Sequence, residues 1–297
     1  MKILITGATG FIGLPLVKFL AEQGHEILAL TRTPLKELKS VTFLKADLSS
    51  PKTYFEKVAS FRPEVVIHLA WQDIPNFSFE KSKNNLNYSL DFLSIVISLT
   101  SCKKIIVSGS CFEFNKLNGA CLESDKGLPK DDFTWAKHSL LSWLEFKCNK
   151  VGIQLAWLRI FYVYGPRQRS DSLIPYILSS LKNGNLPEIR TPNNSNDFIY
   201  IEDVVKAFSN AILMDYPSGI YNLGSGFSSP ILDVCTLAEK IVLGTSNLSQ
   251  KLKKESLDIP VSCNFWANYS ESKTYLNWNP SIDLEEGISK TWQWIKD

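Results

Sequence analysis

The sequence predicts an α/β fold: a doubly wound parallel sheet followed by a smaller, irregular α+β C-terminal lobe. Three features of the 297-residue chain predict this fold. Short apolar segments alternate with segments of helical periodicity through the first half, a glycine-rich turn follows the first apolar segment, and the alternation loosens after about residue 165. Strands that alternate with helices form right-handed parallel crossovers, which place helices on both faces of one sheet.

Six strands are expected, each a short and mostly apolar run of the kind that is buried in parallel sheets. The first run ends at Gly7, and the second starts two residues after Gly24. The expected strands are 2–6, 26–30, 41–45, 65–69, 104–107 and 155–159.

Four helices are expected between these strands. Apolar residues recur at helical spacing in 11–23, and Gly24 is typical of a helix C-terminus. Further helical stretches lie at 51–61, 79–100 and 134–150.

The second part of the chain is expected to form the smaller lobe. Prolines at positions 166, 175, 187 and 192 and the polar stretch 191–196 interrupt the alternation there. We therefore expect one domain at 1–165 and a lobe at 166–297, with some segments of the lobe returning to the first domain.

Composition excludes several classes of protein. A formal net charge of +2 gives no electrostatic reason to expect nucleic acid or an anionic membrane as a partner. The first apolar run is too short for a signal peptide, and no apolar span of 18 residues follows, so the expected location is cytoplasmic. The six cysteines form no CxxC pair, and no metal site is expected.

The glycine-rich turn is the first chemical signal. Glycines at 7, 10 and 13 lie between an expected strand and an expected helix at the start of the alternating pattern. Such a turn lets the backbone approach a pyrophosphate, and the helix N-terminus offers free N–H groups. The sequence therefore predicts a Rossmann-type dinucleotide-binding domain at 1–165. The expected cofactor contacts in the turn are Gly7, Thr9, Gly10, Phe11, Ile12 and Gly13.

The end of the second expected strand indicates which dinucleotide is bound. A carboxylate there would hold the ribose 2′-hydroxyl of NAD, whereas Arg32 suits the 2′-phosphate of NADP. NADP (NADPH) is therefore expected rather than NAD, although Arg32 as a solvated loop cation is the alternative. Asp47 and Leu48 are expected to contact the adenine, with a helix-capping role for Asp47 as the alternative.

Several ordered motifs resemble the extended short-chain dehydrogenase/reductase family. They are the glycine turn, Asp47-Leu48, the strand end His68-Leu69-Ala70, and two later segments, 158–166 and 197–204. The tail 272–288 matches the family pattern as well. The resemblance spans the chain and implies action on sugars carried by nucleoside diphosphates. The nearest likeness is to 4-ketoreductases of the CDP-abequose synthase type. It also implies that Leu69, Ala70 and Ser108 contact the cofactor.

The family chemistry needs a Ser or Thr, a Tyr, and a Lys four residues after the Tyr. Residues four apart share one face of a helix, so the lysine can lower the phenol pKa and bind the ribose while the phenol moves a proton. Ser110, with Ser108 as the alternative, matches the hydroxyl residue, and Lys137 matches the lysine. Phe133 stands where the family has its tyrosine.

Phe133 therefore lacks the proton that the family exchanges. Loss of a positioned proton donor costs about 10²–10⁴-fold in rate. Three interpretations are open: an engineered Tyr→Phe change, which we favour, a natural variant that uses another group, and an inactive relative that only binds.

The resemblance also suggests the substrate contacts and the reaction. Cys111 and Phe112 occupy the places of the acid–base pair of dehydratases, which disfavours dehydration. Asn196 stands where relatives carry an arginine for the diphosphate, so Arg167, Arg169 and Arg190 are the candidates for that role. The expected substrate-binding residues are Cys111, Tyr162, Leu173, Ile174, Arg190 and Asn196.

The expected activity is NADPH-dependent reduction of the 4-keto group of a nucleoside-diphosphate 4-keto-6-deoxy sugar. A nucleotide-sugar 4-epimerase and a catalytically inactive dinucleotide-sensing regulator are the alternatives. Helices 79–100 and 134–150 resemble those that form a four-helix interface in relatives, which suggests a homodimer.

Overall fold

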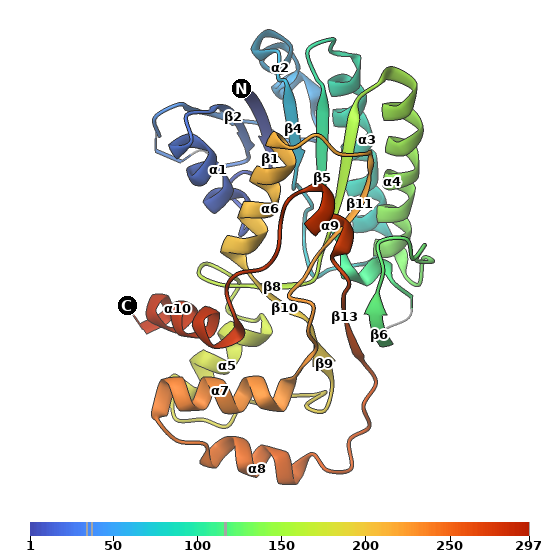
Figure 1. The fold of residues 1–297 in the computed structure, drawn as a ribbon. Helices are drawn as coiled ribbons and strands as arrows, with labels where there is room; N and C mark the ends of the chain where they lie inside the picture. The colour runs from blue at the N-terminus through green and yellow to red at the C-terminus, as the bar shows by residue number, and fades with distance from the viewer. Residues whose placement is uncertain (34, 37, 116–117, 297) are drawn as a thin grey trace.

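The computed structural model describes residues 1–33, 35–36, 38–115 and 118–296 (Figure 1). It confirms the predicted α/β class. Seven parallel strands form one sheet in the order β11-β7-β5-β4-β1-β2-β3. Their bounds are β1 Lys2–Thr6, β2 Glu26–Thr31, β3 Val41–Lys45, β4 Val65–His68, β5 Lys104–Ser110, β7 Gln154–Ile160 and β11 Gly219–Leu223.

Helices cover both faces of this sheet because side chains alternate along each strand. Ile3 and Ile5 of β1 face the cluster that contains α1 (Gly13–Glu22) and α6 (Ile201–Leu213), whereas Leu4 faces the opposite cluster. The helices on that opposite face are α2 Phe55–Phe61, α3 Phe79–Ser98 and α4 Asp132–Val151.

The smaller lobe lies below the sheet in Figure 1. Its helices are α5 Leu173–Lys182, α7 Ile231–Leu243, α8 Asn247–Glu255 and α10 Leu284–Lys296. A four-stranded sheet joins β12 Ser229–Pro230, β9 Ser195–Asn196, β13 Asn264–Ala267 and β6 Asn118–Cys121. A parallel pair is formed by β8 Tyr162–Tyr164 and β10 Phe198–Tyr200. The short helices are η1 Pro51–Thr53, η2 Cys111–Glu113 and α9 Ser270–Tyr275.

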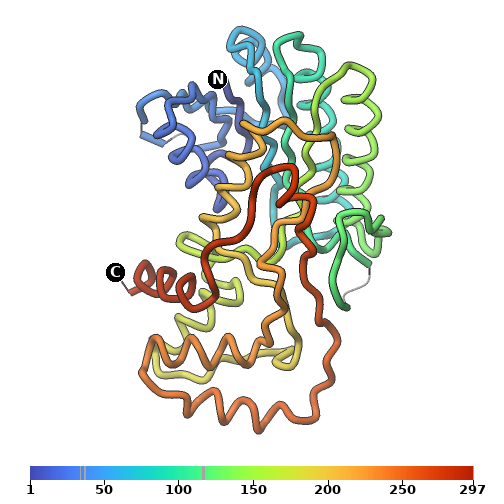
Figure 2. Tube along the Cα trace, viewed as in Figure 1, coloured from blue at the N-terminus to red at the C-terminus, as the bar shows by residue number. Residues whose placement is uncertain are grey.

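The chain passes between the two parts more than once. The trace in Figure 2 leaves the upper sheet after β7, returns to it through α6 and β11, and then descends into the lobe. In the other direction, β6 leaves the first region and pairs with β13 of the lobe. None of the described helices has both the length and the apolar character that a membrane span requires.

Candidate cofactor and active site

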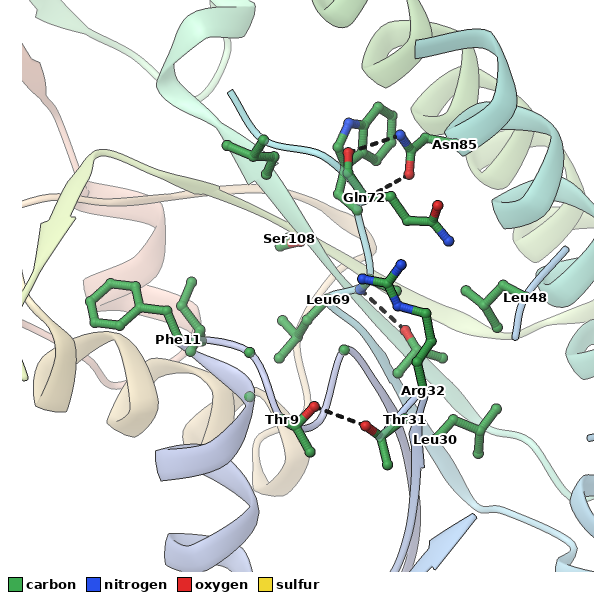
Figure 3. A pocket seen from close by; sticks show the side chains of 18 of the residues that line it. Thr9, Phe11, Leu30, Thr31, Arg32, Leu48, Leu69, Gln72, Asn85 and Ser108 are labelled. Carbon is green, nitrogen blue, oxygen red and sulfur yellow. Dashed lines mark hydrogen bonds between the residues drawn. The ribbon is translucent and has the colours of Figure 1, made fainter. Parts of the chain in front are cut away.

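A cavity of about 630 Å³ opens at the carboxyl ends of the central strands. It lies where the strand order reverses, with β1 paired to β2 on one side and to β4 on the other. Such switch points are where open α/β sheets bind their ligands, and the volume is typical of cofactor sites. Figure 3 shows the glycine turn, the end of β2 and the segment after β4 around it.

The glycine turn has the geometry of an anion cradle. Gly7 adopts a positive φ of 68°, and a Cβ on Gly13 would stand 2.1 Å from the carbonyl oxygen of Gly7. The turn leads into α1, whose N-terminus receives no side-chain cap and has no acidic residue in its first turn. The close backbone approach and the uncapped N–H groups fit a pyrophosphate. The predicted turn residues all line the cavity: Gly7, Thr9, Gly10, Phe11, Ile12 and Gly13.

The end of β2 forms a second wall. The hydroxyl groups of Thr9 and Thr31 are 2.8 Å apart and hydrogen-bonded, which ties the glycine turn to this strand. Arg32 is exposed, and its guanidinium extends toward the centre of the cavity (Figure 3). Leu48 lines the cavity, whereas Asp47 accepts hydrogen bonds from the backbone N–H (2.9 Å) and hydroxyl (2.7 Å) of Ser49. These bonds lower the pKa of Asp47, and the nearby charge of Arg32 lowers it further.

His68, at the end of β4, anchors the third wall. One ring nitrogen is 2.8 Å from the Thr6 hydroxyl and the other is 3.0 Å from the Ser89 hydroxyl. Burial, and then the positive charge of Lys137, lower the His68 pKa to about 3, so the imidazole is neutral and holds strand to helix. The two residues after it that the sequence predicted, Leu69 and Ala70, line the cavity.

Asn85 is a cavity residue that sequence reasoning missed. Its side chain accepts a hydrogen bond from the backbone N–H of Gln72 (2.6 Å) and donates one to the carbonyl of Gln72 (3.2 Å) (Figure 3). The segment after β4 is therefore fixed on α3. A buried asparagine on the inner face of a long helix was the available signal, because buried amides need partners.

The two candidate serines of β5 differ in position. Ser108 lines the cavity, and its hydroxyl is 3.4 Å from the carbonyl of His68. Ser110 does not line the cavity among the residues that the structure describes. Its hydroxyl instead accepts a hydrogen bond from the backbone N–H of Phe112 (3.2 Å) and caps η2. The structure thus places Ser108, the alternative candidate, at the wall of the cavity.

Phe133 and Lys137 share one face of α4, as their spacing predicts. Phe133 is 4% exposed and packs against Trp71 and Phe77, with ring centroids 5.5 and 4.5 Å away. The Lys137 ammonium donates a hydrogen bond to the carbonyl of Ser108 at 2.9 Å. Burial lowers the Lys137 pKa to about 8, while the charge of Glu113 acts in the opposite direction. Neither Phe133 nor Lys137 is among the described residues that line the cavity.

Glu113 is a second residue that sequence reasoning missed. Its buried carboxylate pairs with the Arg159 guanidinium (Nε to Oε2, 3.0 Å) and accepts the indole N–H of Trp157 at 3.0–3.1 Å. It also accepts the backbone N–H of Ser110 at 2.7 Å. This network fixes the serine-bearing turn of β5 on β7. The polar residues lie 44 and 46 positions apart in sequence, so no local pattern could pair them.

Three predicted substrate residues gather in one aromatic cluster at the junction with the lobe. Tyr162 packs against Phe112 and Phe265, with centroids 5.9 and 6.0 Å away. Cys111 belongs to the same cluster, and burial raises the pKa of its thiol. Asn196 is buried nearby, with its side-chain oxygen 3.5 Å from the Cys263 sulfur.

The other predicted substrate residues lie apart from this cluster. Leu173 and Ile174 begin α5, where Ile174 is buried in the core of the lobe. Arg190 is exposed and is not among the described residues that line the cavity, whereas Arg169 does line it. Arg169 also donates a hydrogen bond to the carbonyl of Ile74, which links the loop before α5 to the segment after β4.

Comparison with known proteins assigns the family. The model of the NAD dependent epimerase/dehydratase family matches residues 3–224. The chain is 26% identical to UDP-glucuronate 4-epimerase of Thermodesulfobacterium geofontis (99% of this chain, 96% of the relative). It is also 26% identical to CDP-abequose synthase of Salmonella muenchen (97% and 96%).

Among solved structures, UDP-glucuronic acid 4-epimerase from Bacillus cereus in complex with NAD superimposes with a TM-score of 0.83. The identity is 24%, covering 100% of this chain and 99% of that one. The likeness supports the same fold. The matching family model covers most of the chain, from β1 to β11, and includes every wall of the cavity described above. The chain belongs to the NAD dependent epimerase/dehydratase family, whose members act on nucleotide sugars.

Proposed function

We propose that the chain reduces the 4-keto group of a nucleoside-diphosphate 4-keto-6-deoxy sugar with NADPH. The observation that carries this proposal is Arg32, an exposed guanidinium at the cavity wall where β2 ends. Thr31, not a carboxylate, occupies the strand end beside it. A guanidinium there favours a 2′-phosphate, and a reductase that consumes its cofactor draws on NADPH.

The aromatic cluster suits a deoxysugar. Phe77 contacts both Phe133 and Phe112, and Phe112 contacts Tyr162, so apolar rings run from α4 to the lobe. The Arg159 guanidinium close to this region is already paired with Glu113, whereas the Lys130 ammonium lies over the Phe112 ring and donates to the carbonyl of Phe114. Apolar rings suit the methyl group of a 6-deoxy sugar.

Different residues of the chain would bind the cofactor and the sugar. The glycine turn and the N-terminus of α1 would hold the pyrophosphate, and Arg32 the 2′-phosphate. When bound, the nicotinamide supplies the hydride. A serine of β5, Ser108 or Ser110, would hydrogen-bond the sugar oxygen, and Lys137 would bind the nicotinamide ribose. Phe133 has no proton to give, so the chain as it stands is expected to be slow.

The test is to restore the phenol with Phe133→Tyr. The variant should consume NADPH with a 4-keto-6-deoxy sugar nucleotide about 10²–10⁴-fold faster than the parent chain, because the proton donor returns. Absorbance of NADPH with a panel of such sugar nucleotides measures it. Phe227→Tyr, which adds a phenol to a ring that is 74% exposed on the loop after β11, is the matched control and should leave the rate unchanged. If no substrate of the panel is reduced with tyrosine at 133, the ketoreductase proposal is wrong.

A 4-epimerase is the second candidate, favoured by the similarity to the UDP-glucuronate 4-epimerase named above. Such an enzyme would use the same residues but keep its cofactor, as NAD. Phe133→Tyr would then produce an epimerised sugar nucleotide, detected by chromatography, without a net change in NADPH. This result would favour the epimerase. A dinucleotide-sensing regulator is the third candidate. It would bind the cofactor with an affinity that no sugar nucleotide changes.

We also propose that the chain acts in the cytoplasm as a homodimer. Phe79 at the start of α3 and Trp135 on α4 are both exposed, and their ring centroids are 5.9 Å apart. Phe146, three turns after Trp135 on α4, is 63% exposed. An exposed apolar stripe on two adjacent helices is typical of a subunit interface.

A further inference from the structure

Trp71 contacts both the cofactor cavity and Lys137. It lines the cavity, and its ring centroid is 4.0 Å from the Lys137 ammonium. Lys137 is 5% exposed and does not line the cavity among the residues that the structure describes. The ring of a cavity residue therefore covers an ammonium that is itself buried.

The ring stabilises the charge that it covers. Lys137 is in a costly environment, because burial removes water from its ammonium and lowers its pKa to about 8. Its hydrogen bond to the Ser108 carbonyl uses one of three donors. The Trp71 ring face supplies further stabilisation, because the ammonium is attracted to the electron-rich face of the indole. Trp157 and Phe133 contribute more distant rings, at 5.8 and 5.9 Å.

The main chain next to Trp71 is held in place. Asn85 fixes both backbone groups of Gln72, the next residue, on α3. The Trp71 and Phe133 rings pack in a T-shaped arrangement, with their centroids 5.5 Å apart. We therefore expect the indole to move by rotation about its side-chain bonds, while the end of β4 and the backbone next to Trp71 stay in place.

We propose that Trp71 is a positioning residue for Lys137, and that a dinucleotide reaches the ammonium only by displacing the indole from it. The inference rests on the dinucleotide binding proposed above. Ribose hydroxyls would then replace the ring face as partners of the ammonium. Trp71 keeps Lys137 in place before the cofactor binds. Because binding breaks the contact between the ring and the ammonium, Trp71 also weakens cofactor binding.

A double-mutant cycle on NADPH affinity tests the displacement. Trp71→Leu, Lys137→Met and the double variant are compared with the parent chain by calorimetry at pH 6.5, where Lys137 carries its proton. With Lys137 present, Trp71→Leu removes a contact that competes with the cofactor and should tighten NADPH binding. With Met at 137 there is no such contact, so the gain in affinity should be about tenfold smaller. Trp71→Phe, which keeps a smaller ring face, should fall between.

Trp294→Leu is the matched control, since this tryptophan is 49% exposed on α10 and should leave the Kd unchanged. A second readout is the titration of Lys137, followed by NMR of its labelled Cε. Loss of the ring face in Trp71→Leu should lower the Lys137 pKa further, and the smaller ring of Trp71→Phe should lower it less.

The outcomes separate the two proposals. If the variants bind NADPH and the cycle shows no coupling, Trp71 is a fixed wall and the displacement is wrong. If the parent chain and all its variants bind neither NADPH nor NADH, dinucleotide binding itself is wrong. Trp71→Phe preserves the packing if Trp71→Leu fails to fold, so the cycle can be completed with the milder change.

Discussion

At the scale of single residues, we expect Arg32 to select NADPH over NADH. Arg32→Glu replaces a cation with a carboxylate at the end of β2. The variant should bind NADPH about 10²-fold more weakly, because a charge-assisted pair is replaced by repulsion, and should bind NADH at least as well as before. Calorimetry with both cofactors measures the change.

Arg190→Glu is the control for net charge, since Arg190 is exposed away from the described cavity lining. It should leave both affinities unchanged. Equal affinities for NADPH and NADH in the parent chain would remove the role given to Arg32 and favour an NAD-retaining epimerase.

Glu123 gives the molecule a pH-dependent stability. It lies just after β6, is 6% exposed, and its Oε1 atom has no hydrogen-bond partner among the described residues. Burial raises its pKa to about 7, so the folded state binds a proton more tightly than the unfolded chain. Stability should therefore fall as pH rises from about 4.5 to about 7 and then level off.

Glu123→Gln removes this titration. The variant should unfold at a higher temperature than the parent chain at pH 8 and at nearly the same temperature at pH 4.5. Thermal unfolding monitored by circular dichroism at the two pH values measures the difference. Glu145→Gln, which changes an exposed carboxylate on α4, is the control. An equal effect of Glu123→Gln at both pH values would show that charge is not the cause.

Individual site residues could be predicted where their signal is local. The glycine turn and Arg32 sit at fixed offsets from strand ends, and all line the cavity. Trp71 and Asn85 could not be assigned in the same way, because their roles depend on contacts with α4 and with the segment after β4. Their partners were set by tertiary packing, which no spacing in the sequence encodes. The catalytic roles of Ser110, Phe133 and Lys137 stay predictions.

At the scale of elements, the Glu113–Arg159 pair joins η2 to β7. Glu113→Ala leaves the Arg159 guanidinium buried without its counter-charge, and should lower the free energy of unfolding by about 3–5 kcal/mol. Chemical denaturation measures it. The double variant Glu113→Leu with Arg159→Met should recover much of the loss, since both charges are gone. If the double variant loses as much unfolding free energy as Glu113→Ala, side-chain packing and not the unpaired charge causes the destabilisation.

The buried strands could be predicted from the sequence because each is a continuous apolar run of several residues. All six expected strands are present, and β5 and β7 extend beyond the predicted bounds. The expected helix at 51–61 is divided into η1 and α2 at Tyr54. The missed strands are β11, with mixed polarity, and the very short or polar β6, β8, β9, β10, β12 and β13. Their pairing is set by the partner strand, which propensity cannot supply.

At the scale of the whole molecule, we expect the exposed apolar side chains of α3 and α4 to form the interface of the proposed dimer. Phe146→Glu places a charge on this surface and should convert a dimer into a monomer, measured as a halved mass by light scattering. Phe227→Glu is the control, because Phe227 is 74% exposed on the loop after β11. A monomeric mass for the parent chain would rule out the dimer.

The position of β11 has a consequence for how the molecule is made. This strand pairs with β7 at the edge of the large sheet, yet residues 161–218 separate the two in sequence. A chain growing on the ribosome therefore displays β7 as an open edge until the strand beyond residue 218 emerges. Open edges template pairing between chains. The nascent protein thus exposes β7, a strand that is almost fully buried in the finished fold, until β11 has emerged and takes its place at the edge of the sheet.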